Sequence, residues 1–218
     1  MPSEVISRYL EAIYYMRAEG ETVTNARLAE WLSVSRPTVT AGLRRMARDG
    51  LLQQDSGKEV LFTEEGEARA AAIVRRHRIV ERWLTDSLGL DWVVADEEAA
   101  RLEHTISEVV ENRLYESLGR PRSCPHGNPI PGHSEPVEGE VRLAGLSGGT
   151  ATVTRISEVA EREAPSLLHY LFERNLVPGT RVAVLEVDPV GNTIRLRAAE
   201  RDVTLGIDTA AKVWVLPE

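Results

Sequence analysis

A segment rich in proline and glycine divides this chain of 218 residues into two parts with different hydrophobic patterns. Residues 119–139 contain five of the eleven prolines and four glycines, which is the composition of a linker. Before this segment, apolar residues recur at helical spacing, and after it they alternate in short runs typical of strands. We therefore expect a helical N-terminal part and a C-terminal small β-barrel.

The part of the chain before residue 72 shows the order of a winged helix-turn-helix domain, which is three helices followed by a β-hairpin. Thr24 or Asn25 can cap the second helix, and Ser35 can cap the third, which tolerates Pro37 in its first turn. Gly50 is typical of the residue that ends such a helix. The expected elements are helices over residues 4–17, 25–32 and 35–49 and β-runs over residues 51–54 and 60–62.

The third of these helices has an outer face suited to the major groove of DNA. Small and hydroxyl-bearing side chains permit close approach, while arginine pairs with guanine edges or with phosphates. Residues 35–48 carry four arginines and no acidic side chain, although the whole chain has a net charge of −8. Residues 1–80 hold 12 basic and 11 acidic side chains, so the acidic excess belongs to the rest of the chain. The candidate DNA-contacting residues, including one in the hairpin turn, are Ser35, Arg36, Pro37, Thr38, Thr40, Ala41, Arg44, Arg45, Arg48 and Lys58.

Two long helices are expected between the winged domain and the linker. Thr63 can cap the first, which should run to about Leu88, and Asp96 is expected to open the second. The apolar stripe of the second helix extends to Leu118, and the two helices carry more apolar surface than a monomer of this size can cover. We therefore expect a helical dimer interface and a homodimer.

The remaining composition argues against a membrane or secreted protein. No apolar run approaches the roughly 18 residues that a membrane span needs, and the N-terminus lacks the basic-then-apolar pattern of a signal peptide. Cys124 is the single cysteine, which excludes an internal disulfide framework and suits a reducing compartment. These observations predict a soluble cytoplasmic protein with no membrane partner.

Three pairs of side chains offer metal ligands. The first pair is four residues apart on an expected helix and shares one face, the second is adjacent in sequence, and the third is a Cys-x-His pair in the linker. Each pair alone has an ordinary structural explanation, such as a surface ion pair or an inert thiol, so the three together carry the argument. Imidazole, carboxylate and thiolate suit Mn(II), Fe(II), Co(II) or Zn(II). The pairs are His77 with Glu81, Glu103 with His104, and Cys124 with His126.

Five stretches occur in an order and spacing that is specific to one family. They read RYLEAIYYM, SRPTVTAGLRRMARDGLL, RRHRIVERWL, EEAARLEHTISEVVENRL and CPHGNPIPG, and they cover most of residues 5–132. In these stretches the chain resembles the diphtheria-toxin-repressor family of iron- and manganese-dependent transcriptional repressors, and residues 140–218 resemble its SH3-like (FeoA-like) C-terminal domain more loosely. The resemblance implies a homodimer that binds operator DNA when divalent metal is bound and represses metal-uptake genes.

The resemblance also implies the domain organisation of the family's three-domain form, which is mainly α with β. The expected units are a winged helix-turn-helix domain over residues 1–72, a helical metal-binding and dimerisation domain with the linker over residues 73–138, and an SH3-like domain over residues 139–218.

The family uses two metal sites, and the resemblance implies that one of them is intact in this chain. Its ligands come from the first long helix, from the Cys-Pro-His motif of manganese-responsive members and from the C-terminal domain, where Glu163 is the candidate and Ser166 stands at an acidic position of that branch. Asp96 falls where some members have a histidine ligand. The residues that match this site are His77, Glu81, Cys124, His126, Glu163 and Asp96.

The second family site is altered. Glu103 and His104 match it, but Arg8 and Ala100 stand where two further ligands are expected. One hypothesis is that the Arg8 guanidinium replaces the positive charge of a metal by pairing with Glu103. The alternative is a displaced metal with ligands from Glu11, Glu103, His104 and Glu98.

Mn(II) is the expected ion and Fe(II) the second candidate, while Zn(II), Co(II) or Cd(II) are expected to substitute in vitro. Two other functions stay open. One is a DNA-binding regulator that senses redox state or a small molecule through Cys124 and the barrel, with metal only structural. The more remote one is a zinc hydrolase, although the sequence contains no His-Glu-x-x-His motif.

Overall fold

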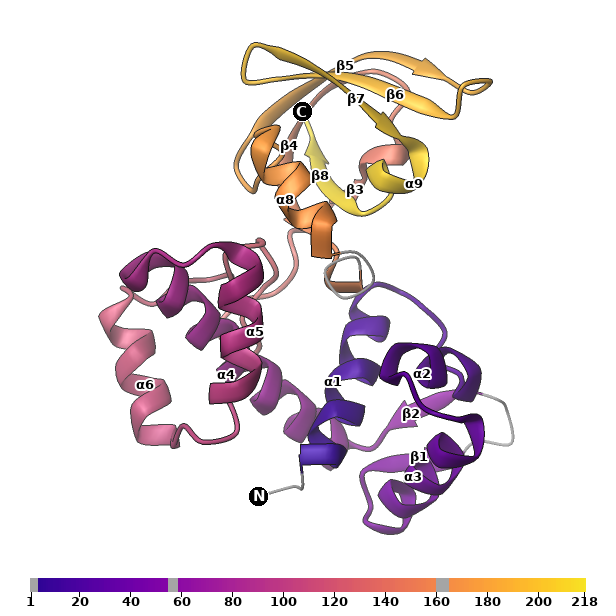
Figure 1. Ribbon diagram of the computed structural model, residues 1–218, viewed down its shortest axis with the longest axis vertical. Coiled ribbons are helices and arrows are strands. Elements are labelled where there is room, and N and C mark those ends of the chain that lie inside the picture. Colours follow the sequence, from indigo (N-terminus) through magenta and orange to yellow (C-terminus); the bar gives the residue numbers. More distant parts are fainter. Residues whose placement is uncertain (1–3, 55–58, 160–164) are drawn as a thin grey trace.

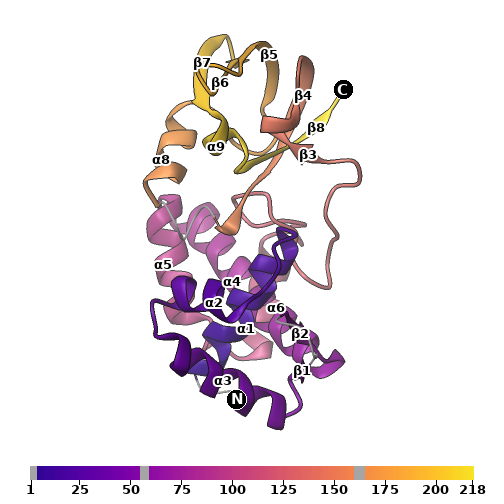
Figure 2. The same ribbon diagram turned by 90° about the vertical axis from the view of Figure 1, so that its right-hand side faces the viewer.

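The computed structural model describes residues 4–54, 59–159 and 165–218 of a chain with three units. A winged-helix unit lies at one end of the molecule and a β unit at the other, with a helical unit beside them (Figure 1). A second view confirms that α3 (Arg36–Arg48) lies at the end opposite the β unit (Figure 2). Within the described residues, no helix has the length and apolar character needed to span a membrane.

The winged-helix unit forms as its capping residues predict. The Thr24 hydroxyl accepts a hydrogen bond from the Arg27 backbone N–H at 3.2 Å, and Ser35 accepts one from Thr38 at 3.3 Å. The apolar faces of the helices meet in a closed core. The predicted order of three helices and a hairpin is confirmed as α1 (Glu4–Ala18), α2 (Asn25–Leu32), α3, β1 (Leu52–Gln54) and β2 (Val60–Phe62), with β1 and β2 antiparallel.

The long helix α4 (Glu64–Leu88) belongs to two units at once. Thr63 caps its first turn, as predicted, by accepting a hydrogen bond from the Gly66 backbone N–H at 3.0 Å. Ile73 in its first half packs into the winged-helix core, whereas Val80 in its second half packs in the helical unit. The boundary expected after residue 72 therefore falls inside one continuous helix.

The prediction of one long helix after α4 is wrong, because two helices stand in its place. α5 (Trp92–Leu102) begins four residues before Asp96, since the Asp91 carboxylate accepts hydrogen bonds from two backbone N–H groups of its first turn. α6 (Glu108–Ser117) begins after a turn and is capped by Ser107. The apolar spacing continues through this turn, so periodicity alone could not reveal the break.

The C-terminal unit is a curved antiparallel sheet with α8 packed beside it (Figure 1). The alternation after the linker predicts strands over residues 140–143, 150–156, 181–187, 193–197 and 213–216, and each of these ranges contains a strand. With β7 added, the sheet order is β3-β8-β4-β5-β6-β7. The elements are β3 (Val141–Arg142), η1 (Leu143–Gly145), β4 (Gly149–Ile156), α8 (Pro165–Glu173), β5 (Arg181–Asp188), β6 (Thr193–Ala198), β7 (Arg201–Gly206), α9 (Ile207–Ala210) and β8 (Val213–Pro217).

The edge strand β7 was not expected from the sequence. Its turn from β6 is formed by Ala199 and Glu200, which adopt positive φ values of 44° and 70°. Hairpin turns of this kind normally contain asparagine or glycine, which tolerate positive φ. Since neither residue type is present at these two positions, the turn gave no sequence signal.

Glu19, directly after α1, joins the winged-helix unit to the β unit. Its side chain is 2% exposed, and its carboxylate lies 2.6 Å from Arg142 Nη2 and 2.7 Å from Arg155 Nη1. Trp214 Nε1 donates to the same carboxylate at 3.1 Å, and both guanidinium groups lie 4.1 Å from the centre of the Trp214 ring. One carboxylate of the winged-helix unit thus pairs with two arginines of the β unit, and we call these four residues the Glu19 cluster. Arg155 has a second carboxylate partner, Glu140, at 2.7 Å.

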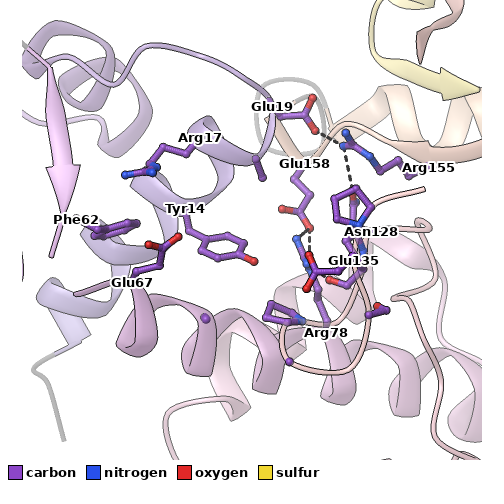
Figure 3. Close-up of a pocket in the computed structure, with 17 residues that line it drawn as sticks. Tyr14, Arg17, Glu19, Phe62, Glu67, Arg78, Asn128, Glu135, Arg155 and Glu158 are labelled. Atoms are coloured by element: carbon purple, nitrogen blue, oxygen red, sulfur yellow. Dashed lines mark hydrogen bonds and ion pairs between the residues drawn. The ribbon is translucent and has the colours of Figure 1, made fainter. Parts of the chain in front are cut away.

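A second ion pair, between Arg78 of α4 and Glu158, connects the helical and β units (Figure 3). Both ion pairs lie along a cavity of about 390 Å³ at the junction of the three units, which Tyr14 of α1 also lines. Buried ion pairs therefore connect the three units at this junction and fix the orientation of the units relative to one another.

Glu19→Gln should destabilise the protein by about 3 kcal/mol at almost unchanged side-chain volume, because it removes one of the two carboxylates that pair with buried Arg155 and also the carboxylate that pairs with half-buried Arg142. Urea denaturation measures the change. Glu21→Gln is the matched control, since Glu21 forms a half-exposed ion pair with Arg27 whose loss costs at most about 1 kcal/mol. Equal effects of the two substitutions would contradict the assigned role of Glu19.

Candidate functional site

The outer face of α3 is exposed where the sequence predicts DNA contact. Thr40 differs from the other candidates, because its half-buried hydroxyl donates to the Arg36 carbonyl at 3.0 Å and accepts from Asn25 of α2 at 3.2 Å. Thr40 therefore stabilises the packing of α2 on α3, and Lys58 lies outside the described residues. The exposed candidates are Ser35, Arg36, Pro37, Thr38, Ala41, Arg44, Arg45 and Arg48.

A first group of metal-ligating side chains joins α4 to the linker. Glu81, Cys124 and His126 offer ligand atoms that all lie within 4.8 Å of one another. Glu81 and Cys124 are 2% exposed and His126 is 0% exposed. His126 Nδ1 lies 2.8 Å from Glu81 Oε1. This carboxylate, thiol and imidazole, which we call cluster 1, form a buried donor set that suits a divalent transition metal.

The linker holds Cys124 and His126 in a fixed position because it is hydrogen-bonded to β4. The His126 carbonyl accepts a hydrogen bond from the Ile156 N–H at 2.9 Å, and Asn128 Nδ2 donates to the Ile156 carbonyl at 2.9 Å. Gly127 adopts φ +88°, and a Cβ there would lie 2.1 Å from the Thr154 carbonyl oxygen. Only glycine allows this approach, so the Cys-Pro-His-Gly motif also serves as a contact with the β unit.

A second group joins three helices, with ligand atoms of Glu11, His77 and Glu103 within 4.8 Å of one another. Glu11 lies on α1, His77 on α4, and Glu103 directly after α5. His77 Nδ1 lies 2.7 Å from Glu103 Oε2, and His77 Nε2 lies 3.1 Å from Asp96 Oδ1. This oxygen and nitrogen donor set, which we call cluster 2, is of the kind that Mn(II) and Fe(II) accept.

The structure groups the side chains differently from the expected site, which remains a prediction. His77 and Glu81 were expected in one metal site, whereas here they lie in different clusters, because α1 and α5 approach α4 at His77 and the linker approaches it one turn later. Asp96 likewise lies beside His77. Glu163, the proposed ligand from the β unit, lies outside the described residues.

The altered site favours the second of the two sequence-based hypotheses. Arg8 is exposed, and among the described residues no ion pair joins it to Glu103, whose carboxylate instead lies beside His77 and, at 3.4 Å, His104. Glu11 joins Glu103, as the displaced-metal alternative expected. His104 is half-buried and lies outside this group of ligand atoms, and Glu98 forms an ion pair with Arg101 instead.

The electrostatics of cluster 2 favour a positive charge at its centre. Burial disfavours the charged form of the His77 ring, but hydrogen bonds with Asp96 and Glu103 outweigh this effect and raise the pKa of His77 well above its usual range. In the protein without metal, this shift favours the protonated form of His77. Its imidazolium then occupies the place between carboxylates that a bound cation would otherwise take.

The fold and these two clusters define a winged-helix DNA-binding protein with buried donor sets for transition metals. Three family descriptions match successive parts of the chain. Residues 1–60 match the N-terminal DNA-binding domain of iron-dependent repressors, and residues 63–132 match their metal-binding and dimerisation domain. Residues 143–217 match the FeoA domain.

Similar proteins give the same assignment. The iron-dependent repressor IdeR of Mycobacterium leprae (strain TN) is 38% identical over 218 residues, covering 95% of this chain and 94% of that protein. The diphtheria toxin repressor of Corynebacterium diphtheriae is 45% identical over 127 residues, covering 58% of this chain and 56% of that protein. The chain therefore belongs to the iron-dependent repressor family, also called the diphtheria-toxin-repressor family.

Solved structures agree in fold. A manganese-dependent transcriptional repressor in complex with manganese superposes with a TM-score of 0.85 at 31% identity, covering 97% of this chain and 99% of that one. The repressor ScaR with bound Zn²⁺ gives a TM-score of 0.83 at 26% identity over the full length of both chains. These relatives are DNA-binding repressors and not enzymes, which sets aside the zinc-hydrolase alternative.

Three contributors to the site were missed in the sequence. Asn128 and Gly127 were quoted as part of a motif, but their contacts with β4 depend on a strand that is distant in sequence. The ring of Trp92, which packs against His126, lies at the start of a helix whose N-terminus was predicted four residues too late. An Asp91 side chain directly before an apolar run was the available signal for this cap.

The metal-free protein should lose stability as the pH rises above about 6.5. The folded-state pKa of His77 is higher than its unfolded value, so its contribution is complete below the unfolded pKa and is lost as pH rises through the folded one. Urea denaturation in the presence of a chelator measures this slope. His77→Gln should flatten it, whereas the neighbouring His104→Gln should not. A slope unchanged in His77→Gln would overturn the assignment.

Proposed function

We propose that this chain is a transcriptional repressor that binds operator DNA as a homodimer when divalent metal occupies clusters 1 and 2. The observation that carries the proposal is that each cluster draws its ligands from separate segments of the chain. Cluster 1 connects α4 with a linker bonded to β4, and cluster 2 connects α1 of the winged-helix unit with α4 and the end of α5. Metal binding is thereby coupled to the arrangement of the units.

The protein's own residues explain why this coupling needs a cation. In cluster 2, the carboxylates of Glu11 and Glu103 lie close together, and like charges repel at this separation unless a positive charge lies between them. A protonated His77 ring can supply that charge without metal, but as a hydrogen-bond donor it does not coordinate Glu11 and Glu103 together. A bound divalent ion supplies positive charge and fixed coordination geometry between the two carboxylates. With the charge balanced, Glu11 holds α1 against α4, and α1 carries the rest of the winged-helix unit with it.

The β unit takes part through cluster 1. Glu81 projects from α4, while Cys124 and His126 are held against β4 by the carbonyl and glycine contacts described above. When these three side chains share one ion, the β unit is fixed relative to the helix that runs into the winged-helix core. Glu163 remains our proposed additional ligand from the β unit.

DNA binding by a homodimer is supported by two surfaces. The exposed face of α3 carries four arginines and small side chains, which suit phosphate and major-groove contact. On the helical unit, several large apolar side chains are exposed and would be covered by a second copy. A two-fold dimer could then place two copies of α3 in successive major grooves, about 34 Å apart. The exposed apolar residues are Leu88, Val94, Val109 and Val110.

We propose Mn(II) as the physiological ion, with Fe(II) as the second candidate. The oxygen and nitrogen donors of cluster 2 suit either ion, and the thiol of cluster 1 adds a softer ligand that also favours zinc. Similar proteins include repressors named for iron and for manganese, and a related repressor has been solved with Zn²⁺ and with Cd²⁺. We therefore expect Zn(II), Co(II) and Cd(II) to bind in vitro.

Chelator-stripped protein should bind DNA fragments from upstream of metal-transport genes weakly, and Mn(II) should strengthen binding about tenfold or more. Fluorescence anisotropy at fixed ionic strength measures both states. The double variant Cys124→Ser with His126→Ala should lose most of this stimulation. His169→Ala is the control, because that imidazole is exposed on α8.

Two outcomes contradict this account. Full stimulation in the double variant would remove cluster 1 from the mechanism. Tight, specific binding by the chelator-stripped wild type would show that metal is only structural, and it would favour a regulator that senses redox state or a small molecule.

A further inference from the structure

Trp92, the first residue of α5, covers the imidazole of cluster 1. The rings of Trp92 and His126 are T-shaped, with centroids 4.7 Å apart and planes at 85°. The His126 side chain has no exposed surface, so the indole forms part of the wall that separates this ligand from solvent. Edge-to-face packing of this kind is a preferred geometry of aromatic pairs.

The Trp92 ring also contacts the β unit. Its centroid lies 5.2 Å from that of Phe172 on α8, again in a T-shaped arrangement with planes at 70°. Trp92 and Val93 both pack against the hydrophobic core of the β unit. Three rings from α8, α5 and the linker therefore form a continuous row, Phe172–Trp92–His126.

This row of rings ends at His126, and the orientation of its imidazole decides whether it can bind a metal in cluster 1. The backbone of His126 is fixed by its hydrogen bond with β4, but a backbone bond leaves the rotation of the imidazole ring undetermined. Metal ligation requires one ring nitrogen to face Glu81 and Cys124. An indole placed at right angles to the imidazole restricts that rotation through van der Waals contact along the ring.

Trp92 also stands on the helix that supplies cluster 2. Asp96 lies one turn after Trp92 on the same face of α5, and Glu103 follows the end of this helix. Both carboxylates bond with His77. A displacement of α5 that moves the indole therefore also moves the two partners of His77.

We propose that Trp92 is a positioning residue that orients His126 for metal binding and, through α5, links cluster 1 to cluster 2 and to the β unit. This inference rests on the proposed function only in requiring that cluster 1 binds metal. Trp92 is not itself a metal ligand in either cluster, since the indole offers no ligand atom for a metal.

The test compares Trp92→Leu, Trp92→Phe and Val93→Ala. Cobalt(II) is the probe, because the charge-transfer absorption of a cobalt thiolate reports binding at Cys124 and therefore at cluster 1 alone. Trp92→Leu should weaken Co(II) binding about tenfold, the lower end of the range for residues that support metal ligands. Trp92→Phe should restore most of the affinity, since a ring again contacts His126. Val93→Ala removes neighbouring packing with the β unit and keeps the indole next to His126, so it should bind Co(II) as the wild type does.

A second readout uses the metal-free protein. The ring protons of His126 should show an aromatic shift in the NMR spectrum that disappears in Trp92→Leu and persists in Val93→Ala. Unchanged Co(II) affinity in Trp92→Leu would overturn the proposal, as would an equal loss in Val93→Ala, which would make the effect one of general packing. If the wild type itself shows no thiolate-to-cobalt band, the proposed function of cluster 1 fails, and that result is distinct from failure of the Trp92 inference.

Discussion

Three buried polar side chains on α4 each need a partner from a different part of the chain, and the rest of the structure is arranged around them. His77 meets Asp96 and Glu103, Arg78 meets Glu158, and Glu81 meets His126. A charged group in the interior is tolerated only when such partners reach it. If α4 rotated or slid by one residue, all three contacts would be lost together. This requirement fixes the position of α5, the linker and the β unit relative to one helix.

The same arrangement explains how a metal ion could influence DNA binding at a distance. The exposed face of α3 lies at the end of the molecule opposite the β unit (Figure 2), and it contacts neither cluster. Packed side chains connect the two clusters with α3, because Ile73 of α4 and the apolar face of α1 share the hydrophobic core on which α3 packs. The Glu19 cluster adds a direct bond from the end of α1 to the β unit. Fixing the linker to α4 therefore constrains the orientation of α3 without any contact between metal and DNA.

The sequence predicted those parts of the structure that local chemistry decides. Thr24, Ser35 and Thr63 act as caps because each hydroxyl accepts a hydrogen bond from the backbone N–H three residues later. A cap of this kind depends only on neighbouring residues, so it can be predicted from the sequence. The sequence did not predict the turn before α6, because the apolar spacing continues through it. It did not predict strand β7 either, because the turn before this strand contains neither glycine nor asparagine. The grouping of side chains in the structure differs from the expected ligand sets for another reason. His77 and Glu81 share a helix face, yet which cluster each joins depends on where α1, α5 and the linker cross α4, and this is decided by tertiary packing.

The central claim is that metal binding joins separate units of this chain into one arrangement. Hydrogen–deuterium exchange with and without Mn(II), with metal binding verified calorimetrically in the same samples, tests it most directly. The account predicts that Mn(II) slows exchange in the linker at residues 122–130 and, at the same time, in α1, although these segments are far apart in sequence. Metal binding that protects the linker and leaves α1 unchanged would contradict it.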